Sequence, residues 1–136
     1  MHIIELSGTE DELYRLVGPL VMDPAVLKQN YNFPFRTSTR FVWFVAKEDF
    51  SDVVLGFLPV ECKRSGYVIN NYYIRDKNAA MLTALLERVL SAFSGTPLEA
   101  VAFREDADTF RAAGFTVEKE WTRYIRMRKE PRHGSR

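Results

Sequence analysis

The spacing of apolar side chains changes near the middle of the chain from a strand pattern to a helical one. Residues 67–74 are rich in β-branched and aromatic side chains and predict a buried central strand, whose apolar run is interrupted by Asn70 and Asn71. An amphipathic helix follows, with apolar residues recurring every three or four positions: Leu82, Leu85, Leu86, Val89 and Phe93. Asp76 or Asn78 would cap it. This helix N-terminus offers free N–H groups to an anion, although an ordinary strand-to-helix connection has the same pattern.

The N-terminal part of the chain predicts an edge strand and two short helices. Residues 1–6 form the strand. Thr9 and Glu12 have the spacing of a capping box at the start of the first helix. Asp23 followed by Pro24 is typical of an N-cap with proline at the first helical position, so a second helix begins there.

Residues 31–36 contain three aromatic side chains without a regular period, which indicates a loop. The aromatic residues either line the entrance to a substrate site or fill the bottom of the core.

The rest of the chain predicts a mixed sheet. Short polar turns join three strands into an antiparallel meander over residues 40–47, 53–62 and 67–74. A strand at 98–103 must run parallel to the strand at 67–74, because a helix connects the two. A short helix at 106–113 ends at Gly114, and one final strand follows at 115–127. The predicted fold class is therefore α/β with a mixed sheet, a meander followed by a βαβ unit.

Composition narrows the kind of protein. The chain has 136 residues, of which 46% are hydrophobic, so we expect one domain over residues 1–130, followed by a basic tail at 131–136. Cys62 is the only cysteine, the first residues lack a signal-peptide pattern, and no apolar run approaches the roughly 20 residues of a membrane span. We expect a cytoplasmic monomer or homodimer without a membrane anchor. His2 and His133 lie at opposite ends without an acidic cluster, so no metal site is expected.

Three short motifs follow one another at spacings that match the predicted elements. They are Val53-Val54-Leu55-Gly56-Phe57, Phe110-Arg111-Ala112-Ala113-Gly114-Phe115 and Met127-Arg128-Lys129. With the order of strands and helices, they resemble the GCN5-related N-acetyltransferases over nearly the whole chain. The resemblance implies transfer of an acyl group from acetyl-CoA, or another acyl-CoA, to an amine acceptor, which the sequence does not identify.

The resemblance also implies where the cofactor binds. The family holds the pyrophosphate on a glycine-rich turn at the start of the long helix, and the three defined positions of this turn correspond to Lys77, Ala80 and Leu82. The implied cofactor-binding residues are Tyr73, Ile74, Lys77, Asn78, Ala79, Ala80 and Met81. Leu82 stands where a small residue is usual, so it either blocks the approach of the phosphates or packs into the core. We favour the core.

Candidate catalytic groups follow from the same resemblance. The main chain of the central strand, at Asn71, Tyr72, Tyr73 and Ile74, would bind the thioester oxygen and hold the pantetheine arm. The position of the family's proton-donating tyrosine is taken by Phe110, so a hydroxyl from Tyr72 or Tyr73, or solvent, would replace it.

A base for the amine is less clearly marked. Glu61 is the only acid inside the meander strands and is a candidate base, although a solvent-facing carboxylate near a hairpin is the simpler interpretation. Asn70 or Asn71 could instead position a water, or could serve as hydrogen-bonding residues where the sheet splays.

The C-terminal segment is the most basic part of the chain. Trp121 and Tyr124 are interleaved with its basic residues Arg123, Arg126, Arg128, Lys129, Arg132 and Arg136, a pattern that is compatible with nucleic-acid binding or with a solvated tail. The alternative to an enzyme is therefore a catalytically degenerate binding or interaction module, marked by the altered turn and associating with nucleic acid through this segment.

Overall fold

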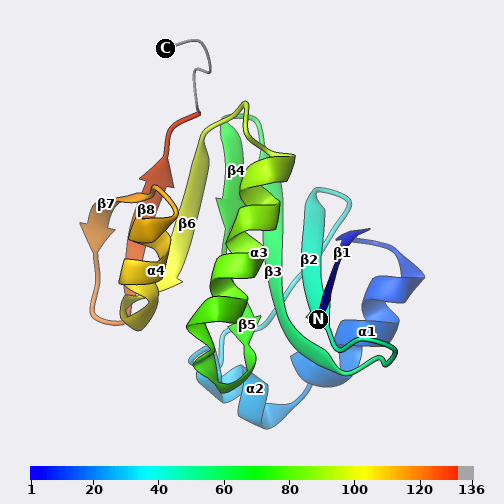
Figure 1. Cartoon of the computed structure of the whole chain (residues 1–136). Coiled ribbons are helices and arrows are strands. Elements are labelled where there is room, and N and C mark those ends of the chain that lie inside the picture. Colours follow the sequence, from blue (N-terminus) through cyan, green and yellow to red (C-terminus); the bar gives the residue numbers. More distant parts are fainter. Residues whose placement is uncertain (132–136) are drawn as a thin grey trace.

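The computed structural model describes residues 1–131, which form a twisted mixed sheet with helices on both faces (Figure 1). Within these residues the strand order is β1-β2-β3-β4-β6-β8-β7, and β5 pairs with β3 outside this path. The strands are β1 (His2–Ser7), β2 (Phe41–Lys47), β3 (Val54–Lys63), β4 (Gly66–Ile69), β5 (Tyr73–Ile74), β6 (Leu98–Phe103), β7 (Thr116–Glu120) and β8 (Tyr124–Lys129). The helices are α1 (Asp11–Val21), α2 (Pro24–Gln29), α3 (Ala79–Ala92) and α4 (Ala107–Ala112), and short 3-10 turns precede α3 (Arg75–Lys77) and α4 (Arg104–Asp106).

The predicted mixed sheet is confirmed. β1, β2, β3 and β4 pair as an antiparallel meander, with β1 at the edge. β4 and β6 are parallel and are connected by α3, as the βαβ unit requires.

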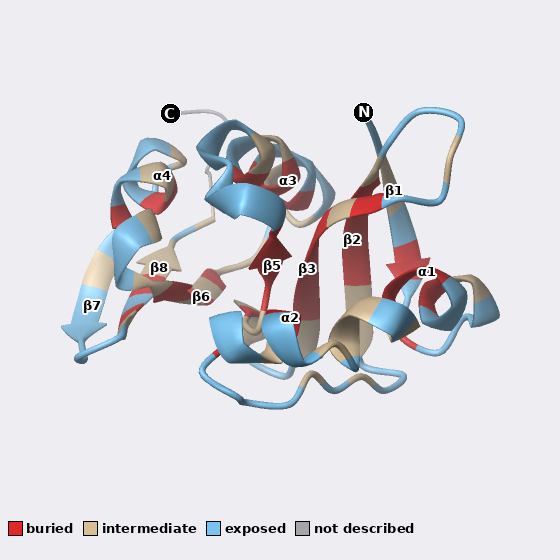
Figure 2. Ribbon diagram, turned by 90° about the horizontal axis from the view of Figure 1, so that it is seen from below, coloured by how far each residue is buried: buried red, intermediate tan, exposed pale blue. Residues whose placement is uncertain are grey.

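Both faces of the sheet are buried at β2, which agrees with the unbroken apolar run of its sequence. Trp43 and Val45 pack in the core layer that contains α1 and α2. Phe44 and Ala46 point the other way, into the layer under α3 and α4. Figure 2 shows these two helical layers on opposite sides of the sheet.

The predicted continuous strand at 67–74 is wrong, because the chain breaks it into β4 and β5. Asn71 has a φ of 56°, in the left-handed region that asparagine tolerates better than most residues. Its backbone N–H donates to Oδ1 of Asn70 at 2.8 Å. The two amides that interrupt the apolar run therefore end one strand and redirect the chain before the next.

The final strand predicted at 115–127 is also wrong, because it is a hairpin of β7 and β8. Trp121 N–H donates to the carbonyl of Tyr124 at 2.9 Å and closes the turn. The turn contains no glycine, proline, asparagine or aspartate, so it lacks the usual signals, and the alternating pattern continues across it. β7 lies at the sheet edge, and all its side chains except the half-buried Val117 are exposed.

The start of α1 differs from the predicted capping box as well. Glu10, rather than Thr9, is the N-cap residue, and its own side chain does not cap the helix. Glu10 instead accepts a hydrogen bond from the Ser7 N–H at 2.8 Å, which ties the helix to the end of β1. The N-cap of α2 agrees with the prediction, since the Asp23 side chain accepts from the Ala25 N–H.

Leu82 is only 1% exposed and packs in the core beneath α3, as we favoured from the sequence. We expect Leu82→Ala to lower the free energy of unfolding by about 2 to 5 kcal/mol, because it removes buried methyl groups and leaves a cavity. Urea denaturation measures this change. Thr83→Ala, at the exposed next position, is the control and should change stability by less than about 0.5 kcal/mol. Equal effects of the two substitutions would contradict the core assignment.

Candidate functional site

The candidate site lies where two neighbouring strands separate. Ile69 of β4 lies opposite Ala100 of β6, and this is the last residue pair between these parallel strands. After the break at Asn71 the chain continues as β5, which pairs only with β3. Within residues 1–131, the second edge of β5 therefore has no strand partner.

The pairing of β5 with β3 depends on Gly56, which lies opposite Ile74. A Cβ atom at Gly56 would lie 2.9 Å from the carbonyl oxygen of Tyr73. Any larger residue would push β5 away from β3, so the glycine of the first sequence motif sets the position of the site.

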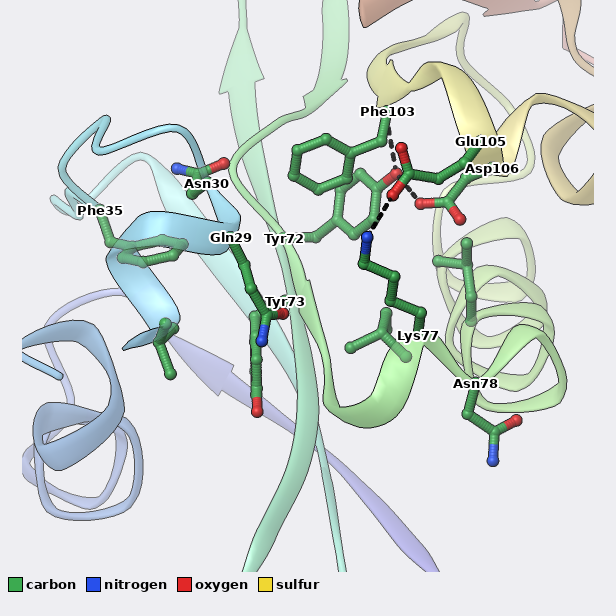
Figure 3. Close-up of a pocket in the computed structure, with 13 residues that line it drawn as sticks. Gln29, Asn30, Phe35, Tyr72, Tyr73, Lys77, Asn78, Phe103, Glu105 and Asp106 are labelled. Carbon is green, nitrogen blue, oxygen red and sulfur yellow. Dashed lines mark hydrogen bonds and ion pairs between the residues drawn. The ribbon is translucent and has the colours of Figure 1, made fainter. Parts of the chain in front are cut away.

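A narrow pocket lies between β5 and the end of β6 (Figure 3). Side chains from α2, from the loop at 31–36, from the turns before α3 and α4, and from the first turn of α3 complete its lining. Its cavity volume is only about 30 Å³, about the share of liquid volume that one water takes. The pocket is small because Tyr72 fills the space between the separating strands.

Tyr72 bridges the two strands with its side chain. Its hydroxyl donates to Oδ2 of Asp106 at 2.6 Å and accepts from the backbone N–H of Phe103 at 3.0 Å. Its ring is buried against Phe103 and Phe110, with ring centroids 5.2 and 5.8 Å away. The hydroxyl thus takes the N–H of Phe103 at the end of β6.

Burial is the main influence on the pKa values of Tyr72 and Asp106. Burial raises the pKa of Tyr72 well above its ordinary value, and the neighbouring Asp106 carboxylate raises it further. Burial also raises the pKa of Asp106, against the hydrogen bond from Tyr72, which lowers it. Tyr72 is therefore a neutral hydrogen-bond donor at neutral pH.

An ion pair lies across the pocket mouth. Lys77 Nζ lies 2.8 Å from Oε2 of Glu105, and Figure 3 shows the lysine reaching from the turn before α3 toward the end of β6. The hydrogen bond to Glu105 raises the pKa of Lys77. Both side chains are exposed, and exposed ion pairs of this kind contribute only about 0 to 1 kcal/mol, so the mouth can open at little cost.

The N-terminus of α3 keeps part of the predicted anion site. Asn78 is the N-cap, and its side chain accepts from the Met81 N–H at 3.1 Å. The Asn78 N–H donates to the carbonyl of Arg75 at 3.4 Å. Ala79 and Ala80 are exposed, and their N–H groups belong to the first turn, where a helix supplies no acceptor. Of the N–H groups of residues 78–81, where phosphate binding is expected, those of Asn78 and Met81 are therefore already used.

Asn30 is a site residue that sequence reasoning missed. It is 2% exposed, and its Nδ2 donates to the Phe33 carbonyl at 3.0 Å and to Oδ1 of Asn71 at 3.1 Å. Its own Oδ1 is buried and has no hydrogen-bond partner in the part of the chain that the structure describes. Such an unsatisfied group costs about 1 to 3 kcal/mol. An asparagine after a predicted helix is usually only a C-cap, so the sequence carried no signal for it.

A wider hollow lies beside Asn71. It has a cavity volume of about 380 Å³, and we call it the aromatic groove; its lining residues are Phe33, Pro34, Arg36, Asn70, Asn71, Val101, Trp121 and Tyr124. Phe33 and Trp121 are 57% and 39% exposed. Phe35 instead packs on Phe57 in the core, with ring centroids 5.3 Å apart. The aromatic loop at 31–36 therefore contributes one side chain to the core and another to an open groove, and the role of that groove as a substrate entrance stays a prediction.

Glu61 lies apart from the pocket that holds Tyr72. It is half-buried, with Oε1 3.9 Å from Nη2 of Arg36, and it lines a small cavity together with Asn70 and Asn71. Of the candidate residues, the pocket itself brings together Tyr72, Tyr73, Ile74, Lys77 and Asn78. The remaining candidates, Glu61, Asn71, Ala79, Ala80 and Met81, are not among its lining residues.

The basic C-terminal segment is largely paired where it is described. Arg126 pairs with Glu118 at 3.3 Å, and Arg128 pairs with Glu99 at 3.6 Å and with Glu130. The guanidinium of Arg123 lies 4.5 Å above the ring of Tyr31. Arg132 and Arg136 lie outside the described residues, so the basic tail and nucleic-acid binding stay predictions.

Two further features concern membrane-spanning helices and metal sites. None of the helices within residues 1–131 is both long and apolar enough to cross a bilayer. In the same residues, no group of three or more His, Cys, Asp or Glu side chains is placed to hold a metal ion.

Comparison with known proteins places this geometry in a fold family. No family model and no curated protein matches the sequence. The structure is similar to an acyl-CoA N-acyltransferase from Pseudomonas aeruginosa, with a TM-score of 0.72, 16% identity, and coverage of 95% of this chain and 99% of that one. It is also similar to Escherichia coli ElaA, with a TM-score of 0.66, 15% identity, and coverage of 96% and 100%.

A third similar structure carries a ligand. The Campylobacter jejuni N-acetyltransferase PseH in complex with acetyl coenzyme A matches with a TM-score of 0.55, 10% identity, and coverage of 95% and 99%. The chain therefore has the fold of the GCN5-related N-acetyltransferases, as the sequence motifs implied.

Asp106 should make the stability of the fold depend on pH. Because its pKa is raised in the folded chain, folding favours the protonated form. The resulting stabilisation is complete below the unfolded pKa of about 4 and is lost as the pH rises through the folded pKa. Asp106→Asn stays neutral and should lose less stability than the parent between about pH 4 and pH 7, measured by urea denaturation. An equal or larger loss in the variant would contradict the raised pKa.

Proposed function

We propose that this protein is an acyl-CoA-dependent N-acyltransferase that transfers an acetyl group from acetyl-CoA to an amine. The observation that carries the proposal is the separation of β5 from β6 after Ile69, which leaves one edge of β5 unpaired beside the N-terminus of α3. The similarity to acyltransferase structures, one of them bound to acetyl coenzyme A, supports the same activity.

Acyl transfer needs donors for the thioester oxygen and a proton or hydrogen bond for the leaving thiolate. The main chain of Tyr73 and Ile74 on the free edge of β5 would supply the first. Phe110 has no proton to give, but the Tyr72 ring packs against it and brings a hydroxyl to the same part of the fold. Because the raised pKa of Tyr72 lies above that of a thiol, this hydroxyl would stabilise the thiolate by a hydrogen bond rather than transfer its proton outright.

The amine must also lose a proton. In this proposal the proton passes to a water held by Asn71 or to Glu61, which lines the neighbouring cavity with that asparagine. Asn71 also lines the aromatic groove, where an acceptor could enter, whereas Glu61 lines only the neighbouring small cavity.

Acyl-CoA binding would require two side chains to move. Tyr72 occupies the space between the strands, and the Lys77–Glu105 pair lies across the mouth. Once released from Glu105, the Lys77 ammonium could serve the pyrophosphate as a point charge beside the N–H groups of Ala79 and Ala80.

Lys77 and Glu105 provide a matched pair of variants for the cofactor site. We expect Lys77→Ala to weaken acetyl-CoA binding about tenfold in titration calorimetry, because a phosphate contact is lost. Glu105→Gln breaks the same ion pair and leaves the Lys77 ammonium available to the cofactor, so acetyl-CoA binding should be unchanged or tighter. Thermal unfolding serves as the check on folding. If Lys77→Ala leaves the affinity unaltered, Lys77 does not belong to the cofactor site.

A second candidate function is a catalytically degenerate binding module. The filled pocket favours it. The Tyr72 hydroxyl already donates one hydrogen bond and accepts another, and the side chain leaves a cavity of only about 30 Å³. In such a protein the tyrosine would be a permanent part of the sheet rather than a group that gives way to a cofactor.

Two substitutions of Tyr72 distinguish these functions. For an acyltransferase, Tyr72→Phe keeps the ring and removes the two hydrogen bonds that hold it between the strands, so we expect acetyl-CoA affinity equal to or tighter than that of the parent and a turnover at least about tenfold lower. For a degenerate module, the parent binds no acetyl-CoA, and only Tyr72→Ala, which empties the space between the strands, could gain binding. Calorimetry and thiol release from acetyl-CoA measure both outcomes.

A further inference from the structure

The orphaned oxygen of Asn30 is the starting observation. The orientation of this amide is fixed by the Phe33 carbonyl, since a carbonyl oxygen can only accept and therefore must face Nδ2. Oδ1 is then the end without a partner among the described residues. Figure 3 shows it turned toward the side of the pocket that holds Tyr72 and Phe103. An oxygen in this position requires a donor, such as an N–H group of a ligand.

The position of Asn30 identifies which ligand group would donate. Asn30 lines the Tyr72 pocket, and its Nδ2 is bonded to Asn71, which lines the aromatic groove. The two hydrogen-bonded amides therefore lie between the space proposed for the thioester and the space proposed for an acceptor. In an acyl transfer the amine must reach the thioester carbon at this junction.

The chemistry of an amide oxygen suits that task. A carboxylate beside an ammonium group favours the charged form and raises its pKa, whereas a neutral oxygen in a buried site does so less. An amine held by Asn30 would be oriented without losing its tendency to give up a proton.

The groove indicates what carries the amine. Its lining is mainly aromatic and apolar, and its volume of about 380 Å³ falls in the range of small-molecule sites. The one charged side chain among its lining residues is a cation, Arg36, whose Nη2 lies 3.9 Å from Oε1 of Glu61. Aromatic faces favour an aromatic ligand, and the guanidinium disfavours a polyamine.

We propose that Asn30 Oδ1 binds the amine of the acceptor substrate, and that the acceptor is a primary amine on an aromatic body that occupies the aromatic groove. This inference rests on the acyltransferase function proposed above. The ammonium group first gives one proton to the water or carboxylate described there. The amine nitrogen then attacks the thioester carbon, the bond from carbon to sulfur breaks, and the second proton lost by nitrogen ends on the thiolate, so that CoA leaves as the free thiol.

The acceptor class is tested by following thiol release from acetyl-CoA with phenethylamine, tryptamine and spermidine. We expect kcat/KM for the two aromatic amines to exceed that for spermidine at least about tenfold. An equal or higher value for spermidine would overturn the acceptor class and leave the acyltransferase function standing. A chain that binds no acetyl-CoA in calorimetry would instead refute the function on which the inference rests.

The role of Asn30 is tested by two variants. Asn30→Leu should raise KM for phenethylamine at least about tenfold and leave the Kd of acetyl-CoA within about twofold. Asn30→Asp places a carboxylate beside the amine, so the pH–rate profile should move to higher pH, which a purely structural role would not cause. Asn32→Gly, at an exposed position of the same loop, is the control and should change neither quantity. The assignment would be overturned if KM for phenethylamine and the Kd of acetyl-CoA rose together and the pH–rate profile did not shift.

A measurement on the parent chain covers the case in which the variants fail to fold. The side-chain amide resonances of Asn30 are followed by NMR in the CoA complex. We expect them to shift when phenethylamine is added and to stay in place when spermidine is added at the same concentration. Absence of a shift with phenethylamine would overturn the proposal.

Discussion

The site depends on one hydrogen-bonded bridge, from the Tyr72 hydroxyl to Asp106 and to the N–H of Phe103. Two parallel strands that separate inside a protein leave main-chain groups without partners, and a buried unpaired group is costly. The bridge satisfies one of these groups and fills the space with an aromatic ring. It also means that a ligand entering here must replace what the tyrosine supplies, both in hydrogen bonding and in packing.

Much of the fold could be predicted because local patterns determine it. The change of period after residue 74 marked α3, and Asn78 caps it. The unbroken apolar run of β2 indicated burial on both faces, which the packing of Trp43 and Phe44 into opposite layers confirms. The hairpin between β7 and β8 was missed because its turn lacks the residues that usually mark one, while its side chains keep a period of two.

The site was less predictable because it joins residues far apart in the sequence. Tyr72 was a candidate for its hydroxyl, but its bond to Asp106 spans 34 positions, and no spacing rule predicts it. Asn30 was not a candidate, because its meaning depends on Phe33 and Asn71 taking its donors and leaving its oxygen unpaired. The Asn70-Asn71 pair lies between these cases: its interruption of the apolar run was visible in the sequence, but the strand break and the cavities beside it were not.

The exposed strand β7 has a consequence for assembly. A sheet edge offers unpaired N–H and C=O groups to any other strand, and long apolar edges promote aggregation. β7 is only five residues long, and three of its side chains are charged: Glu118, Lys119 and Glu120. A second copy that added its own β7 would have to bring the same charges alongside, so continuous growth of the sheet across molecules is disfavoured at this edge.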